Sequence, residues 1–131
     1  MKAKVLIIWL IAILGVNTLN AQDSKFGDDP DRCRAELSTY DQFFKQGSLD
    51  DAYPAWSWCF KNCPKSTKNI YIQGPDLLEH KIESSEGEEK EAYIDTLLMI
   101  YDKRIENFNS EGKNLGKKAI KMMKHRSSKA M

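Results

Sequence analysis

Three cysteines, Cys33, Cys59 and Cys63, are the residues of this 131-residue chain with the most specific chemistry. A thiol can attack as a nucleophile, bind a soft metal or form a disulfide, and its neighbours decide which. A nucleophilic Cys59 would need a base and an oxyanion site, and no pattern in the sequence supplies them. His80 and His125 stand at no metal-ligand spacing with cysteine or carboxylate. We therefore expect no enzyme activity, no metal site and no cofactor.

A cluster of glutamates is the second candidate for chemistry. Its members are Glu83, Glu86, Glu88, Glu89 and Glu91. Calcium and magnesium sites usually combine aspartate, asparagine and backbone oxygens in a tight loop, which this run lacks. Acidic residues stabilise the start of a helix by opposing its dipole, so we interpret the cluster as a helix N-terminus. The whole chain carries 20 basic and 19 acidic residues, and this near balance argues against nucleic acid as a partner.

The first 21 residues have the organisation of a secretory signal peptide. Lys2 and Lys4 form a positive start, residues 5–16 are an apolar run, and Ala21 is the expected last residue removed. The run is shorter than the about 20 apolar residues that a membrane helix needs, and an uncleaved anchor is the alternative. We therefore expect an exported protein of the periplasm or cell envelope, or a secreted one, with no membrane span after cleavage.

Residues 29–64 have the pattern of two helices folded back on each other. Asp29 and Pro30 are typical of a helix start, and Gly47 is typical of a helix end. A second helix begins after Ser48 and must stop at Pro64. Because only Gly47 and Ser48 join the two helices, they must run antiparallel. This arrangement brings the start of the first helix beside the end of the second.

The hairpin predicts a disulfide between Cys33 and Cys63, with Cys59 as a buried free thiol. Cys59 and Cys63 are four residues apart on one helix, where Cβ atoms lie about 5–6 Å from each other. A disulfide needs about 3.5–4.5 Å between them. An exported protein meets the oxidising conditions under which such bonds persist. Three unpaired core cysteines are the alternative.

Further helices are expected after the hairpin, within one domain over residues 29–125. A second helix pair spans residues 68–108. Its first helix contains Gly74 and Pro75, where we expect a kink or a break because proline removes a backbone hydrogen bond. Its second helix begins near Glu88 and is the longest of the chain.

The two ends of the domain are expected to differ in order. Residues 22–28 are interpreted as a flexible lead-in. A final helix is predicted over residues 112–124, followed by a basic tail over residues 126–131. The apolar stripe of that final helix consists of Leu115, Ala119, Met122 and Met123.

The spacing within residues 47–64 resembles the second half of a tetratricopeptide repeat. The matching positions are a turn glycine, a small residue, an aromatic, a second small residue and a closing proline: Gly47, Ala52, Trp56, Cys59 and Pro64. The wider pattern, in residues 61–66, 69–72 and 91–97, resembles the N-terminal part of exported tetratricopeptide-like proteins of Bacteroidetes-type bacteria. The resemblance implies an all-α fold, with antiparallel helix hairpins in a right-handed stack of about five helices.

The resemblance also implies a function, that of a non-catalytic module or scaffold that binds an unidentified protein or peptide. In such repeats the first helix of each pair lines a shallow concave face. The residues of this chain at those positions are Arg34, Asp41, Phe44, Lys45, Lys68 and Tyr71.

A second class of function is a peripheral binder of anionic membrane or polyanion surfaces. After Glu111 every charged side chain is basic: Lys113, Lys117, Lys118, Lys121, Lys124, Arg126 and Lys129. These charges could give salt-dependent adhesion to lipid head groups. The same lysines also suit the solvated face of a final helix, so both interpretations stay open.

Overall fold

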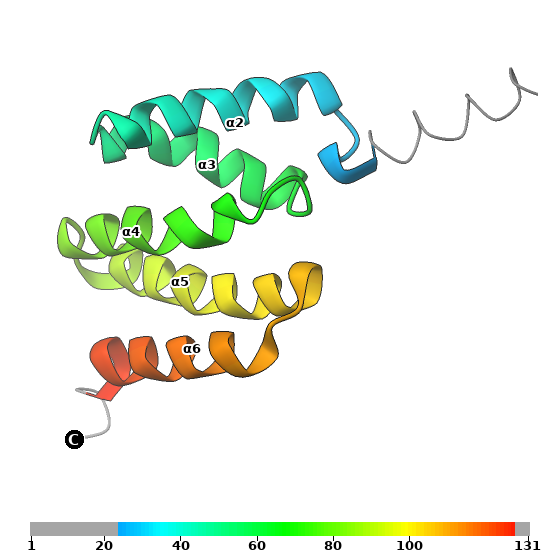
Figure 1. Cartoon of the computed structure of the whole chain (residues 1–131). Helices are drawn as coiled ribbons and strands as arrows, with labels where there is room; N and C mark the ends of the chain where they lie inside the picture. Colours follow the sequence, from blue (N-terminus) through cyan, green and yellow to red (C-terminus); the bar gives the residue numbers. More distant parts are fainter. Residues whose placement is uncertain (1–23, 128–131) are drawn as a thin grey trace, which may run out of the picture.

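The computed structural model describes residues 24–127, and every regular element in that range is a helix (Figure 1). The elements are η1 (Ser24–Phe26), α2 (Pro30–Lys45), α3 (Leu49–Asn62), α4 (Asn69–Glu83), α5 (Gly87–Phe108) and α6 (Glu111–Arg126). The prediction of an all-α protein with about five helices is therefore confirmed. The predicted signal peptide over residues 1–21 and residues 128–131 of the predicted tail lie outside the described residues.

The helices stack in chain order, each lying against the next, from α2 at one end to α6 at the other (Figure 1). Local signals set the first boundaries. The side chain of Asp29 accepts a hydrogen bond from the backbone N–H of Arg32 at 3.1 Å, and Pro30 occupies the first helical position. Gly47 ends the first helix at a φ of 76°, a conformation that favours glycine.

The lead-in differs from the flexible segment that the sequence predicted. Residues 24–26 form η1, and Phe26 packs against the core. Gly27 has a φ of 76°, and a Cβ atom on it would stand 2.3 Å from the backbone oxygen of Asn62. Glycine thus lets the segment lie directly on the end of α3, which holds it in place.

Trp56 lies at the centre of the core. Its side chain is fully buried, and its Nε1 donates a hydrogen bond to the backbone oxygen of Ile70 at 2.8 Å. The ring of Phe60 stacks on it, with ring centroids 5.2 Å apart. A Cβ atom on Gly74 would stand 2.6 Å from the Trp56 ring, so glycine is what allows α4 to approach α3 this closely.

α4 runs without a break through Gly74 and Pro75, where the sequence predicted a kink or a break. Proline costs this helix one hydrogen bond, but the residues around it are anchored in the core. Tyr71 is buried before it, and Leu77 and Leu78 are buried after it. Packing on both sides therefore keeps the helix continuous.

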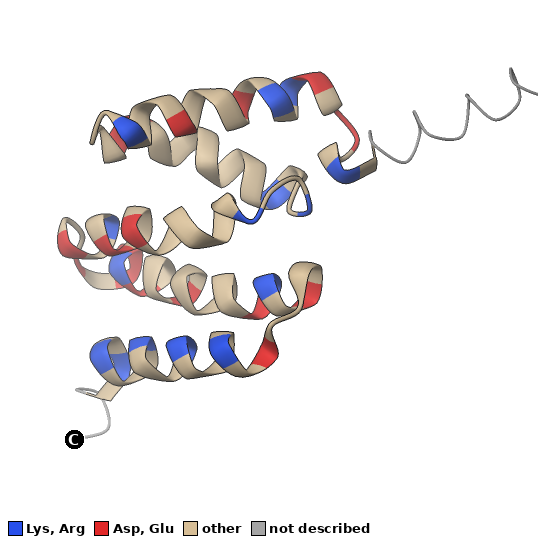
Figure 2. Cartoon of the chain, in the orientation of Figure 1, with Lys and Arg blue, Asp and Glu red and all other residues tan. Residues whose placement is uncertain are grey.

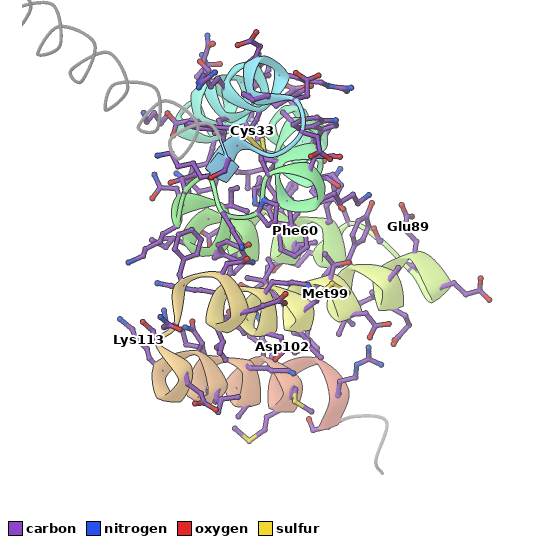
Figure 3. The ribbon with its side chains drawn as sticks, turned by 90° about the vertical axis from the view of Figure 1, so that its right-hand side faces the viewer. Cys33, Phe60, Glu89, Met99, Asp102 and Lys113 are labelled. Carbon is purple, nitrogen blue, oxygen red and sulfur yellow. A yellow bond between two sulfur atoms is a disulfide. The ribbon has the colours of Figure 1, made fainter. Side chains whose placement is uncertain are left out.

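A disulfide joins Cys33, in the first turn of α2, to Cys63, at the end of α3 (Figure 3). Their Cα atoms are 6.3 Å apart and 30 positions separate them in the chain. Cys59 is a buried free cysteine. This is the pairing that the hairpin geometry predicted, with Cys59 as the free thiol.

Candidate functional site

Two open grooves flank α4. The first lies between α2 and α4 and has a volume of about 410 Å³. Its walls include Ser38, Asp41 and Lys45 from α2, and Asn69 and Gln73 from α4. Lys45 and Asp41 form an ion pair across one turn, with 2.5 Å between Nζ and Oδ2. Gln73 Oε1 is shielded from solvent and accepts no hydrogen bond from any residue between 24 and 127.

The second groove lies between α4, α5 and α6 and has a volume of about 320 Å³. Two exposed isoleucines line it, Ile72 at 53% and Ile120 at 59% exposure. Arg104 and Lys117 line it as well, and neither forms an ion pair with a described residue. The groove thus combines two exposed isoleucines with charged side chains, among which Arg104 and Lys117 outnumber the one carboxylate, Asp76.

The two grooves make one surface of the alternate helices α2, α4 and α6, which we call the alternate-helix face. Ile72 and Asp76 border the second groove, whereas Asn69 and Gln73 border the first. At 3.6 residues per turn these four positions form one stripe along α4. α4 therefore forms a ridge between two channels.

Three of the six predicted contact residues line these grooves. Asp41 and Lys45 border the first, and Tyr71 borders the second. Tyr71 is only 1% exposed and its hydroxyl is occupied. It donates to the backbone oxygen of Pro64 at 2.7 Å and accepts from Asn107 at 3.0 Å. Burial raises the pKa of Tyr71 to about 12, so the phenol stays neutral and holds α4 to α5.

The other three predicted residues, Arg34, Phe44 and Lys68, line neither groove. Arg34 lies over the Phe26 ring, 4.5 Å from its centroid, and pairs with Asp31 at 3.3 Å. Phe44 packs partly buried against the core. Lys68 lies 5.9 Å from the centroid of the Phe108 ring.

Sequence reasoning missed the residues that give the second groove its character. These are Ile72, Arg104, Lys117 and Ile120. One available signal was the position of Ile72, an apolar residue outside the stripe formed by the buried residues of α4. The location of Arg104 opposite Lys117 depends on how α6 packs, which no local pattern encodes.

α6 is held by ion pairs to α4 and α5. Lys118 Nζ forms an ion pair with Asp102 Oδ2 at 2.7 Å. Arg126 forms one with Glu91, with 3.0 Å between Nη1 and Oε2, and another with Asp95. In Figure 3 Asp102 lies between α5 and α6. Figure 2 shows basic positions spread along α6 and acidic ones gathered around the loop between α4 and α5.

Glu79 of α4 is the centre of this contact. Its Oε1 accepts hydrogen bonds from Lys121 Nζ at 2.7 Å and from Lys124 Nζ at 2.9 Å. His125 Nε2 lies 3.5 Å from the same oxygen. Burial alone would raise the pKa of Glu79, but the hydrogen bonds from Lys121 and Lys124 outweigh it and lower the pKa to about 2. The carboxylate is therefore charged at any physiological pH.

This contact reverses the orientation of α6 that the apolar stripe suggested. Its side towards α5 carries the buried Asn114, while Leu115 is 47%, Met122 46% and Met123 63% exposed. Ala119 is exposed with them. The stripe faces outwards because the carboxylates of α4 and α5 bind the opposite, basic side of the helix.

Among residues 24–127, no three histidine, cysteine, aspartate or glutamate side chains gather as a metal site would require. The Cys59 thiol has a pKa raised to about 12, chiefly by burial and also by the charge of Glu36. Within the same range no helix is both long and apolar enough to cross a bilayer.

No family model, curated protein or solved structure matches the chain.

Proposed function

We propose that the protein is a non-catalytic, tetratricopeptide-like interaction module whose alternate-helix face binds an extended segment of a partner protein. The observation that carries this proposal is the pair of grooves on either side of α4. An exposed isoleucine, Ile72, projects at the edge of one of them. Exposed apolar side chains beside a groove are typical of a surface that a partner covers.

Two features support a repeat-like stack as the basis of this surface. The helices succeed one another in antiparallel pairs, α2 with α3 and α4 with α5, and α6 follows on the side of α5 away from α3. Gly74 takes the small-residue position that allows the first helix of the second pair to pack closely. Arrays of this kind use the face of their first helices as an extended binding surface.

The groove chemistry indicates what the bound segment contains. An apolar side chain fits between Ile72 and Ile120, where it would remove both from water. An acidic group near it would neutralise Arg104 and Lys117. A donor further along would satisfy Gln73 Oε1. The favoured partner is therefore an extended segment that combines apolar and acidic residues.

A non-catalytic role is favoured by the state of Cys59. Catalysis by cysteine requires a thiolate, and a buried thiol with a pKa near 12 stays protonated at neutral pH. Localisation outside the cytoplasm is favoured by the Cys33–Cys63 bond, since such bonds persist in oxidising compartments. We place the protein in the periplasm or cell envelope, in keeping with the signal-like first 21 residues.

Adhesion to anionic surfaces through the basic C-terminal helix has less support. Lys118, Lys121, Lys124 and Arg126 are engaged by carboxylates of α4 and α5. Within α6 this leaves Lys113 and Lys117 without an ion pair. At roughly 1 kcal/mol per lysine near an anionic surface, two charges give weak attachment.

Site-specific photocrosslinking in the native compartment tests the alternate-helix face. A benzophenone side chain replaces Ile72 in one variant and Met99, on α5, in the other. The two residues are matched, at 53% and 45% exposure, and Met99 lines neither groove. We expect one dominant adduct from position 72 that is missing from position 99.

A second variant, Ile72→Glu, should abolish the crosslink from a benzophenone placed at Asp76, which lines the same groove, because it puts charge into the apolar part of the groove. Identical adducts from positions 72 and 99, or no adduct from position 72, would contradict the proposal.

A further inference from the structure

The outermost surface of α6 is apolar and has no partner among residues 24–127. We call it the outer face of α6, and it consists of Gly112, Leu115, Gly116, Ala119, Ile120, Met122 and Met123. Its four large side chains are between 46% and 63% exposed. Among the described helices, α6 lies at one end of the stack and packs against α5 (Figure 1).

A terminal helix of a stacked array normally presents a polar outer face, because nothing covers it. α6 does the opposite. Its polar side, with Lys118, Lys121 and Arg126, is turned inwards to carboxylates, and its apolar side is left outside. The helix therefore lacks the character of a cap, and its outer face resembles an internal layer of the stack.

Gly112 and Gly116 lie on this face one helical turn apart. A Cβ atom on either would meet no described residue within 4 Å, so packing against residues 24–127 does not explain their small size. Glycine is the least favourable residue in a helix apart from proline. Together with Ala119 they form a row of small, exposed residues over which another backbone could approach α6 closely.

The charges beside the face decide which occupant fits. At 3.6 residues per turn, Lys113, Lys117 and Lys124 flank one edge of the face, and Lys118 flanks the other. Glu111 is the only acidic residue of α6. A second copy of the chain would set lysines mainly against lysines, in either helix direction, and like charges at such positions oppose pairing. A partner helix with acidic flanks meets Lys113 and Lys117, which are free of ion pairs within the described range.

A lipid surface fits less well than a helix. Interfacial helices usually carry tryptophan, phenylalanine or leucine on the buried face. α6 contains no aromatic residue apart from His125, and two glycines occupy its apolar face. Glycine contributes nothing to insertion into lipid, but it permits close contact between helices.

We propose that the outer face of α6 binds an amphipathic helix of another protein, with its apolar stripe against Gly116 and Ala119 and acidic residues on the flank that meets Lys113 and Lys117. The bound helix continues the stack by one layer. This surface shares Ile120 and the flanking Lys117 with the second groove, whereas its other residues line neither groove, so the proposal does not rest on binding at the alternate-helix face.

The test uses two synthetic helical peptides with the same leucine stripe, one flanked by glutamates and the other by lysines. Binding to the purified chain is measured by fluorescence anisotropy. We expect the glutamate-flanked peptide to bind at least about tenfold tighter, a difference of about 1.4 kcal/mol. Equal affinity for the two peptides would overturn the proposal.

Two variants locate the binding. Gly116→Leu puts a large side chain where the partner backbone would approach, and Met123→Glu puts charge on the face; each should weaken binding of the glutamate-flanked peptide at least about tenfold. Neither position packs against the rest of the chain, and leucine favours the helix, so the Gly116→Leu variant should fold. The control Met99→Glu, at an exposed position of α5 that lines neither groove, should leave binding unchanged. Loss of binding in the control with retention in the two variants would overturn the proposal.

The competing occupants have their own readouts. A concentration-dependent dimer in sedimentation that Gly116→Leu abolishes would assign the face to a second copy. Binding to vesicles of phosphatidylglycerol and phosphatidylcholine that Met123→Glu abolishes would assign it to lipid. Either result would overturn the proposal of a partner helix.

Discussion

Breaking the bond between Cys33 and Cys63 should cost about 3.6 kcal/mol of the free energy of unfolding. The bond closes a loop of 30 positions, and the chain-entropy model gives this value at 25 °C. α2 depends on it strongly, because Cys33 and Tyr40 are the only fully buried residues of that helix. Small domains have roughly 5–15 kcal/mol of total stability, so the loss is a large fraction.

The assay is urea unfolding followed by tryptophan fluorescence, with and without a reductant. At a typical slope for a small domain, the midpoint should fall by about 2 M on reduction. A Cys33→Ala/Cys63→Ala variant is the matched control, because reductant should leave its midpoint unchanged. Hydrogen exchange should show that reduction exposes the amides of α2 before those of α5. Unfolding midpoints that coincide with and without reductant would refute the reasoning, as would three reactive thiols in the denatured, unreduced chain.

Three further predictions concern single side chains. Glu79 has a pKa of about 2 in the fold against an ordinary 4.5, so its stabilisation is present above pH 4.5 and is lost as the pH falls towards 2. After allowance for solvent screening, Glu79→Gln should cost about 1–2 kcal/mol at pH 7 and flatten the acid limb of a stability-against-pH curve; equal acid limbs would contradict this. Gly74→Ala should destabilise by about 1–2 kcal/mol because its Cβ collides with Trp56, whereas Gly116→Ala, in open space, should stabilise by about 1 kcal/mol. Thermal melts that shift in the same direction for both would show that helix propensity outweighs the collision. Cys59 should react with iodoacetamide only at the rate of unfolding, since burial raises its pKa to about 12. Mass spectrometry in rising urea measures this, and rapid labelling without denaturant would contradict it.

The hairpin was predictable because its determinants are local. Asp29 with Pro30 sets the start of α2, and Gly47 sets its end. Once the two helices are known to be antiparallel, the pairing of Cys33 with Cys63 follows from their positions alone. None of these steps requires knowledge of a distant contact.

The orientation of α6 was not predictable in the same way. An apolar stripe of Leu115, Ala119 and Met122 indicates burial when a helix is considered alone. The structure instead buries the basic side, because Glu79 binds Lys121 and Asp102 binds Lys118. These partners are 42 and 16 positions apart in the sequence. Charge pairs at such separations leave no periodic pattern in the sequence.

The candidate site was predictable in outline only. The resemblance pointed to the first helix of each pair, and Asp41 and Lys45 do border a groove there. It did not indicate Ile72 or Arg104, since a groove wall depends on how deeply neighbouring helices interpenetrate. By its spacing Arg34 belongs with Asp41 and Lys45, but its guanidinium lies over the Phe26 ring of the lead-in instead of in the groove.

Because few apolar side chains hold α6 against α5, we expect this helix to separate from the stack more easily than the others. Asn114 is its only fully buried residue, and Glu79, Asp102 and Glu91 hold it by charge. Salt weakens such ion pairs far more than it weakens the apolar packing around Trp56. High ionic strength should therefore release α6 while α2, α3, α4 and α5 stay folded. α6 would then open and close as a unit independent of the other four helices.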